Sequence, residues 1–151
     1  MENKYWLSDS DFNFIYNKVP RLNVDLVIRK EGGIVLVQRA IEPCLGYWHL
    51  PGGTVYKNET IKDASIRIAK NETGLDVDFI KCLSYIEFLN EDRKHINMHT
   101  ISLAVEVLAI GGDLLHDKNA KDIKIVFNEN NVTPTVNEHL QFFKQQNIFN
   151  N

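Results

Sequence analysis

The chain has 151 residues, of which 44% are hydrophobic and 25% are charged, and its formal net charge is -3. This length predicts one domain spanning residues 1–151. The weak negative charge argues against nucleic acid or an anionic membrane as a partner, and no stretch approaches the roughly 20 apolar residues that a bilayer span requires. Because the N-terminus also lacks a leader pattern, we expect a cytoplasmic protein that acts on a small molecule.

The N-terminal segment carries a helix signal. Ser8 is a capping residue type and Asp11 stands three positions after it, which predicts a short helix over about 9–17 that ends before Pro20. Its apolar side chains are Phe12, Ile15 and Tyr16. They pack either on the rest of the chain or on a second subunit.

Two apolar segments, 22–30 and 33–39, are separated by glycines and predict a β-hairpin. Strand alternation places Arg39 on the same face as aliphatic side chains. A buried charge is unfavourable unless it is paired. Three interpretations fit Arg39: it binds a substrate phosphate, it forms a structural ion pair with Asp25, or it reaches solvent at the strand end.

A loop over 40–46 leads through Tyr47 and Trp48 to the adjacent glycines Gly52 and Gly53. The aromatic pair could hold a base or a sugar ring, although a core position is the favoured interpretation for Trp48. The glycines can take backbone angles barred to other residues, and they leave their carbonyl groups uncovered. A metal ion or a phosphate could therefore approach the main chain here.

An amphipathic helix is predicted after this glycine turn and ends at Gly74. Its apolar stripe consists of Ile61, Ala64 and Ile68. Glu72 prolongs that stripe by one turn, so its carboxylate needs a partner. A divalent cation bound by both Glu72 and the Gly52 carbonyl would be such a partner, because hard oxygen ligands suit Mg²⁺ or Mn²⁺. Arg67 lies on another side of the helix, where it can hold Glu59.

The second half of the chain is predicted to contain two long strands, 75–89 and 96–109, joined by a polar connection over 89–94. His95 and His99 stand four residues apart, which in a helix would suggest a zinc pair. In a strand both simply share one face, because the strand period is two. We therefore assign no zinc site here.

The chain then turns at 111–113 and runs through a polar loop over 114–122 into an apolar strand, 123–127. A capping box over 135–138 predicts a C-terminal helix of about 136–147. The apolar face expected for this helix consists of Val136, Leu140 and Phe143. This order of elements gives a mixed sheet covered by helices, an α/β (α+β) fold.

The stretch 53–75 resembles the Nudix box, a pattern with fixed spacing between a glycine, a glutamate, an arginine and a group of acids. The positions that agree are Gly53, Glu59, Arg67, Ala69, Glu72, Gly74 and Leu75. Ile68 and Asn71 replace two acids of the pattern. The resemblance implies the α/β/α sandwich of that family and a requirement for Mg²⁺, with Mn²⁺ as an alternative.

Within the Nudix family, the chain is most similar to the GDP-mannose mannosyl hydrolases, in which the same two acids are replaced. The likeness covers about the first half of the chain, through Leu7, Asp11, Phe12, Pro20, Asp25, Arg39 and residues 46–48. It implies a homodimer that hydrolyses a nucleotide sugar to a free sugar and a nucleoside diphosphate. The substrate-binding residues expected from this are Asp25, Arg39, Tyr47 and His99.

The resemblance also implies roles at the reaction centre. Glu72, the Gly52 carbonyl and Asn119 would hold the metal ion, and Arg39 would stabilise the leaving diphosphate. Arg67 would act through Glu59. Thr54 replaces an arginine that contacts the diphosphate in this branch, and Ala120 stands where the branch has its catalytic histidine, so the general base must come from elsewhere. The candidates for that role are His116 and Asp122.

Two other functions stay open from the sequence. The first is a Nudix pyrophosphohydrolase, in which water attacks a phosphorus atom of a nucleoside diphosphate or triphosphate derivative. The second is a nucleotide-binding module without catalysis, which the replaced positions Thr54, Ile68, Asn71 and Ala120 would suit.

Overall fold

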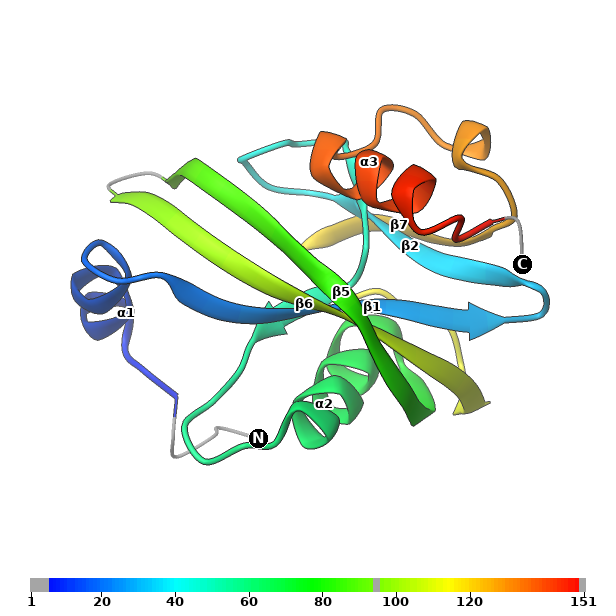
Figure 1. The fold of residues 1–151 in the computed structure, drawn as a ribbon, viewed down its shortest axis with the longest axis horizontal. Coiled ribbons are helices and arrows are strands. Elements are labelled where there is room, and N and C mark those ends of the chain that lie inside the picture. The colour runs from blue at the N-terminus through cyan, green and yellow to red at the C-terminus, as the bar shows by residue number, and fades with distance from the viewer. Residues whose placement is uncertain (1–5, 94–95, 150–151) are drawn as a thin grey trace.

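The computed structural model describes residues 6–93 and 96–149, which form one twisted mixed sheet with helices on both sides (Figure 1). The helices are α1 (Asp9–Tyr16), α2 (Ile61–Thr73) and α3 (Asn137–Gln145), and a 3-10 turn covers Glu129–Asn131. The strands are β1 (Arg21–Lys30), β2 (Gly33–Arg39), β3 (Trp48–His49), β4 (Gly52–Thr54), β5 (Leu75–Arg93), β6 (Ile96–Gly112) and β7 (Ala120–Val126). The expected α/β fold with a mixed sheet is confirmed.

Strand β1 is the centre of the sheet, whose main path runs β3-β2-β1-β6-β5. It lies parallel to β6 from Arg21 to Arg29. It pairs with β2 only at Arg29 and Lys30, whereas its beginning pairs with β4 instead. Strands β1 and β2 therefore diverge, and the segment around β4 occupies the space between them.

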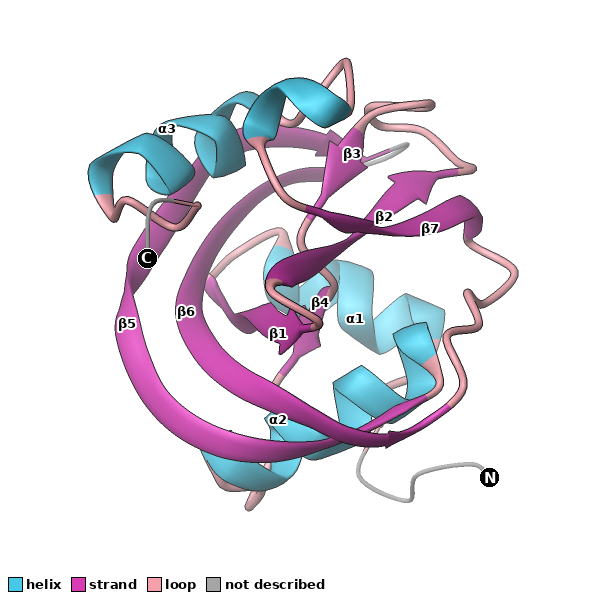
Figure 2. Ribbon diagram, turned by 90° about the vertical axis from the view of Figure 1, so that its right-hand side faces the viewer, coloured by secondary structure: helices cyan, strands magenta, loops and turns pink. Residues whose placement is uncertain are grey.

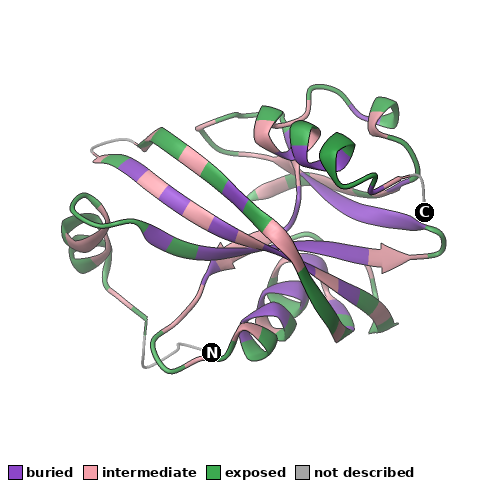
Figure 3. Ribbon diagram, viewed as in Figure 1, coloured by how far each residue is buried: buried purple, intermediate pink, exposed green. Residues whose placement is uncertain are grey.

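Each face of the sheet has its own hydrophobic core. One core joins α2 to the sheet through Val24, Leu26, Ile28, Ala64, Ile68 and Val105. The other joins α3 to the opposite face through Val27, Leu36, Trp48, Ala104, Phe142 and Phe143. In Figure 2 the two helices lie at opposite ends of the view with β1, β2 and β4 between them, and Figure 3 shows that the middle of β1 is buried. The core position expected for Trp48 is confirmed.

The first two helices follow their capping signals. Ser8 accepts a hydrogen bond from the backbone N–H of Asp11 at the start of α1, and Thr60 does the same for Asp63 at the start of α2. Gly74 ends α2 with a left-handed φ of 75°. Both predicted helices are confirmed. In α1, Phe12 packs on Trp6 and Tyr16 of the same chain, and contact with a second subunit stays a prediction.

The predicted turn at Gly52 and Gly53 is wrong, because both residues belong to strand β4 and neither has a positive φ. The structure requires glycine here for its small size. A Cβ on Gly52 would clash with the Asp25 carboxylate and would lie 2.8 Å from the Val24 carbonyl oxygen. A Cβ on Gly53 would lie 3.2 Å from Ile68. Strand β4 can therefore pass close to both β1 and α2.

The predicted polar connection over 89–94 is also wrong. Strand β5 continues to Arg93, which pairs with Ile96 of β6. The polar residues mark an irregularity in the strand: Asn90 has a φ of 54°, and the register shifts between Phe88 and Glu91. At the other end, β6 runs on to Gly112, where a turn was expected. The interpretation of His95 falls outside the described residues.

The C-terminal part needs two corrections. Strand β7 starts at Ala120, so it takes up the end of the loop expected over 114–122. Helix α3 starts at Asn137 and has no side-chain cap, because its N-cap residue is Val136, whose side chain has no acceptor. The Thr135 hydroxyl, expected to cap the helix, donates to the Val132 carbonyl. Its buried residues are His139, Phe142 and Phe143, in place of the predicted Val136 and Leu140. Among the described residues, no helix has the length and apolar character needed to cross a membrane.

Candidate active site

A cavity of about 690 Å³ opens where β1 and β2 diverge. Its lining takes residues from both layers of helices, with Ile68 and Glu72 from α2 and His139 from α3. Strand β1 contributes a row of polar side chains between them. The cavity therefore exists because the split in the sheet lets groups from both faces meet.

The floor of the cavity is polar because of the alternation in β1. Arg21, Asn23 and Asp25 lie on one face and are 8%, 8% and 4% exposed. On β6 their register partners include Thr100 and Ser102, which are also buried. The alternation of polar and apolar residues over 21–26 could have revealed this floor. Of these residues, only Asp25 was expected at the site.

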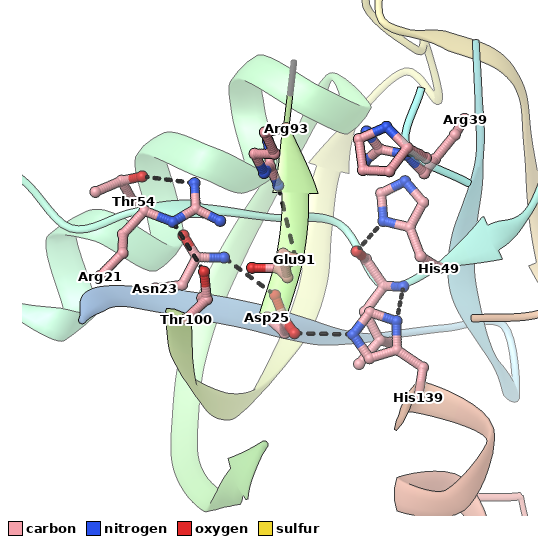
Figure 4. Close-up of polar contacts among 12 residues, drawn as sticks. Arg21, Asn23, Asp25, Arg39, His49, Thr54, Glu91, Arg93, Thr100 and His139 are labelled. Atoms are coloured by element: carbon pink, nitrogen blue, oxygen red, sulfur yellow. Dashed lines mark hydrogen bonds and ion pairs between the residues drawn. The ribbon is translucent and has the colours of Figure 1, made fainter. Parts of the chain in front are cut away.

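Arg21 occupies one end of the floor. Its guanidinium donates to the hydroxyls of Thr100 and Thr54, each at 3.2 Å (Figure 4). Burial lowers the pKa of Arg21 to about 10, and the nearby charge of Arg93 lowers it further, while Glu91 opposes this. Arg21 therefore remains charged at neutral pH and is held by neutral partners.

Asp25 is paired with His139, a residue that the sequence analysis did not select. Nε2 of His139 lies 2.8 Å from Oδ2 of Asp25, and both side chains are almost fully buried (Figure 4). The backbone N–H of Leu50 donates to Nδ1 of His139 at 3.2 Å, so Nε2 carries the proton given to Asp25. The alternative of an Arg39–Asp25 ion pair is wrong. Only the fold reveals the pair, because 114 positions separate its members.

His49 lies beside this pair and also lines the cavity. Its Nδ1 lies 2.7 Å from the Leu50 carbonyl oxygen, which can only accept, so Nδ1 carries the proton. Burial lowers the pKa of His49 to about 3, and the nearby His139 and Arg39 add to this effect. The ring is therefore neutral at ordinary pH, with its lone pair on Nε2.

Two further acids, Glu72 and Asp117, line the cavity and form what we call its acid end. Burial raises the pKa of Glu72 to about 8, and the nearby charge of Asp117 raises it further. The backbone of Gly52 and the charge of Arg39 lower this pKa, but neither offsets the rise. The sequence did not single out Asp117 as a site residue, because the loop before β7 also contains the polar residues His116, Asn119 and Asp122, and spacing alone does not distinguish them.

These groups fit a divalent cation such as Mg²⁺. Two carboxylates that repel each other in a buried place are stabilised by a shared positive ion. Within the described residues there is no group of three or more histidine, cysteine or acidic side chains suited to a metal. Mg²⁺ does not need one, since it is usually bound by one or two carboxylates, waters and substrate phosphates. Glu72, Asp117 and the Asn119 amide would be the side-chain ligands, and the Gly52 carbonyl stays a prediction.

Arg67 holds the loop that precedes α2. It contacts Glu59 through two hydrogen bonds of 2.7 and 3.0 Å, and it also donates to the Thr54 carbonyl. Burial alone would raise the pKa of Glu59, but the bonds from Arg67 and from the backbone N–H of Tyr56 lower it. Arg67 also lies over the Tyr56 ring at 3.7 Å. Any effect of Glu59 on the reaction would therefore pass through the position of this loop.

Arg39 lines the cavity at the end of β2. Its Nε donates to the carbonyl of Pro43, which fixes the side chain against the following loop. Burial lowers the pKa of Arg39, and Arg93 adds to this effect. The charge of Arg39 also reaches both Glu72 and His49. Arg39 is thus placed to bind an anion between them.

The structure does not bring all the expected residues together. Of the sequence candidates, the cavity lining includes Asp25, Arg39, Gly52, Arg67, Glu72 and Asn119. Five others lie outside the lining, namely Tyr47, Glu59, His99, His116 and Asp122. His116 is exposed and contacts the backbone of Asp117, while Asp122 accepts from the N–H of Ile123. His99 points to the sheet face opposite to Thr100, as strand alternation requires.

Comparisons with known proteins show the family of the chain. The family model described as NUDIX domain matches residues 19–146. The low-salt glycan biosynthesis protein Agl8 of Haloferax volcanii is 38% identical over 122 residues, covering 79% of this chain and 78% of that protein. An ADP-ribose pyrophosphatase of Methanocaldococcus jannaschii is 32% identical over 125 residues, covering 83% and 72%.

A MutT NUDIX hydrolase from Burkholderia pseudomallei has the same fold, with a TM-score of 0.73 at 20% identity, covering 85% of this chain and 98% of that one. The family model covers most of the chain, and the site lies around the segment that carries the box. The chain belongs to the Nudix hydrolase family.

Proposed function

We propose that this Nudix protein is a divalent-metal-dependent hydrolase of a nucleotide sugar, and that it releases the free sugar and a nucleoside diphosphate. The observation that carries the proposal is the cavity, in which two repelling acids and Arg39 lie next to a polar floor. An anionic diphosphate, together with a cation, suits the acids and Arg39. A group that carries hydroxyls suits the polar floor. The similarity to a glycan biosynthesis protein supports a sugar substrate.

The chain's own residues would share the work in the following way. Glu72 and Asp117 would hold Mg²⁺ or Mn²⁺, which supplies positive charge to the diphosphate when bound. Arg39 would bind the diphosphate from the other side and stabilise charge that develops on it as it leaves. The pair of Asp25 and His139 would fix the wall beside the sugar, because each satisfies the buried polar group of the other.

His49 is our candidate for the group that takes the proton from water. Its Nδ1–H is fixed to the Leu50 carbonyl, so Nε2 is the nitrogen that can accept. The low pKa keeps this lone pair available over the physiological range. An anionic diphosphate bound nearby would favour the protonated ring and so make His49 a stronger base. His49 replaces the predicted candidates His116 and Asp122 in this proposal, because neither lines the cavity.

A panel of nucleotide sugars with Mg²⁺ and Mn²⁺ tests the reaction, with free sugar and phosphate products scored separately. In ¹⁸O-water, attack at carbon puts the label in the sugar. His49→Gln should lower kcat by about 100-fold while nucleotide binding persists. Binding without turnover across the whole panel would identify a binding module instead.

Attack at phosphorus is the second candidate. Two observations favour it: the 32% identity to an ADP-ribose pyrophosphatase, and the second acid that Asp117 provides beside Glu72. The same isotope experiment separates the two reactions, because attack at phosphorus puts ¹⁸O in a phosphate product. ADP-ribose and GDP-mannose should both be included in the panel for this reason.

A further inference from the structure

The middle of the cavity floor holds two buried polar groups that have no partner. Asn23 is 8% exposed and Ser102 is 0% exposed, and they are register partners on β1 and β6. In the described part of the chain, neither Oδ1 of Asn23 nor Oγ of Ser102 has a hydrogen bond. A buried polar group without a hydrogen-bond partner destabilises a fold. Two of them side by side on a cavity wall indicate a ligand that satisfies both.

The orientation of Asn23 follows from its neighbour. Its Nδ2 lies 3.5 Å from Oδ1 of Asp25, so the amide oxygen is the group left for a ligand (Figure 4). The Ser102 hydroxyl can donate or accept. On either side, Arg21 is held by two threonines and Asp25 by His139. The middle of the floor therefore offers a neutral acceptor next to a hydroxyl.

This pattern excludes several kinds of ligand. The oxygens of a bound phosphate act mainly as acceptors, so its negative charge would face the Asn23 oxygen and the nearby Asp25 carboxylate, with only the Ser102 hydroxyl between them as a donor. A cation would find only a neutral amide oxygen and a hydroxyl here, because the Asp25 carboxylate already accepts from His139 and Asn23. An apolar group would leave both buried polar atoms unsatisfied. A neutral group that both donates and accepts remains.

Two hydroxyls on neighbouring ring carbons have the required chemistry and spacing. Adjacent strands lie about 4.8 Å apart, and each hydroxyl can reach one side chain across an O–H···O distance of about 2.7 Å. One hydroxyl donates to Oδ1 of Asn23, and the other exchanges a hydrogen bond with Oγ of Ser102. Asn23 Oδ1 and Ser102 Oγ are then both hydrogen-bonded, which offsets the free-energy cost of removing them from water.

We propose that Asn23 and Ser102 bind the vicinal hydroxyls of a sugar ring attached to the diphosphate. The proposal rests on the function proposed above and adds the part of the substrate that the floor recognises. The ring has two sources with the same chemistry, the ribose of the nucleoside and the terminal sugar.

Ser102→Ala is the central variant because it separates binding from folding. It deletes an unsatisfied buried hydroxyl, so we expect an unchanged or higher Tm. Its affinity for a ligand with the diol should fall about 3- to 10-fold, the loss of one hydrogen bond. Asn23→Leu, which keeps the size of the side chain, should act in the same direction.

Ser65→Ala is the matched control. Ser65 is also 0% exposed, but its hydroxyl donates to the Ile61 carbonyl within α2 and does not line the cavity. Its removal should lower Tm and leave ligand affinity unchanged. A result in which Ser102→Ala behaves like Ser65→Ala would overturn the proposal.

Calorimetry with Mg²⁺ then distinguishes the two sources of the diol. The first arm compares ADP with 2′-deoxy-ADP and GDP with 2′-deoxy-GDP, and the second compares GDP-mannose with GDP-2-deoxymannose. The wild type should prefer the hydroxylated ligand in one arm, and Ser102→Ala should lose that preference. If the variant keeps the preference, the inference fails alone. If the wild type binds no nucleoside diphosphate, the proposed function fails and the inference fails with it.

Discussion

The two ends of one cavity are built on opposite principles. At the acid end, Glu72 and Asp117 bring like charges together, and burial with this repulsion raises the pKa of Glu72 to about 8. At the floor, Asn23 and Ser102 are neutral, and their buried atoms lack partners among the described residues. The acid end therefore has uncompensated negative charge, and the floor has polar atoms without hydrogen bonds. In the function and the inference proposed above, a different chemical group would complete each end, a cation in one case and hydroxyls in the other.

The comparison shows how a protein can recognise a ligand that is half anionic and half neutral. The acid end would attract a diphosphate only with a cation bound there, because Glu72 and Asp117 are themselves acidic. The floor would bind the sugar without a cation. Variants at the two ends should therefore separate metal-dependent effects from effects on the sugar.

Glu72→Gln should have the largest effect, because it removes a proposed metal ligand while keeping the size of the side chain. We expect kcat to fall by at least about 100-fold. The measurement is the initial rate with Mg²⁺ on the substrate found by the panel. Asp76→Asn is the control, since its carboxylate pairs with Lys70 on the surface. Wild-type rates in Glu72→Gln would show that the acid end does not hold the metal.

His139→Ala should be the most destabilising change at the boundary between the two ends. It leaves the buried carboxylate of Asp25 without its partner, which costs about 3 kcal/mol or more in the free energy of unfolding. Urea unfolding measures this loss. The double variant with Asp25→Asn should recover part of the stability, because the uncompensated charge is then gone. Additive losses in the double variant would contradict a coupled pair.

The acid end should also be visible in the pH dependence of stability without metal. The pKa of Glu72 is about 8 in the folded chain, against an ordinary value of 4.5. The contribution of protonated Glu72 to the free energy of unfolding is therefore complete below about pH 4.5 and is lost as the pH rises through about 8. The Tm of the wild type should fall relative to Glu72→Gln over this range. Added Mg²⁺ should restore it at the alkaline end, and parallel curves would argue against a buried ionisable Glu72.

Asp117→Asn tests the part that the second acid plays. Removing this proposed ligand should weaken Mg²⁺ binding by at least about 10-fold, since loss of even a group that only supports a metal ligand has an effect of that size. The pKa of Glu72 should fall at the same time, because Asp117 is the charge that raises it most after burial. Titration of activity with Mg²⁺ and metal-free NMR of Glu72 measure the two effects.

The smallest effects should come from His116→Ala and Asp122→Asn. Both residues were reasonable bases from the sequence, but neither lines the cavity. We expect kcat to change by less than about twofold for each, as for other exposed residues away from a site. A large loss in either variant would mean that the loop before β7 reaches the substrate and would return the role of base to it.

Local chemistry alone made several features predictable. The caps at Ser8 and Thr60 and the stop at Gly74 depend on neighbouring residues, and the helices they bound are confirmed. Glu72 could be singled out because one helix period carries it along the stripe of Ile68. These signals act within a few positions of the chain, where sequence spacing fixes distance.

What only the tertiary structure decided are the contacts between distant segments. His139 meets Asp25 because α3 packs on the face of β1 that carries the polar row. Asp117 meets Glu72, and Ser102 meets Asn23, through loop position and strand register, neither of which is encoded at a fixed spacing. The sequence determined which side chains are chemically able to serve. Burial and strand pairing decided which of them share the cavity, because desolvation and proximity depend on the folded chain alone.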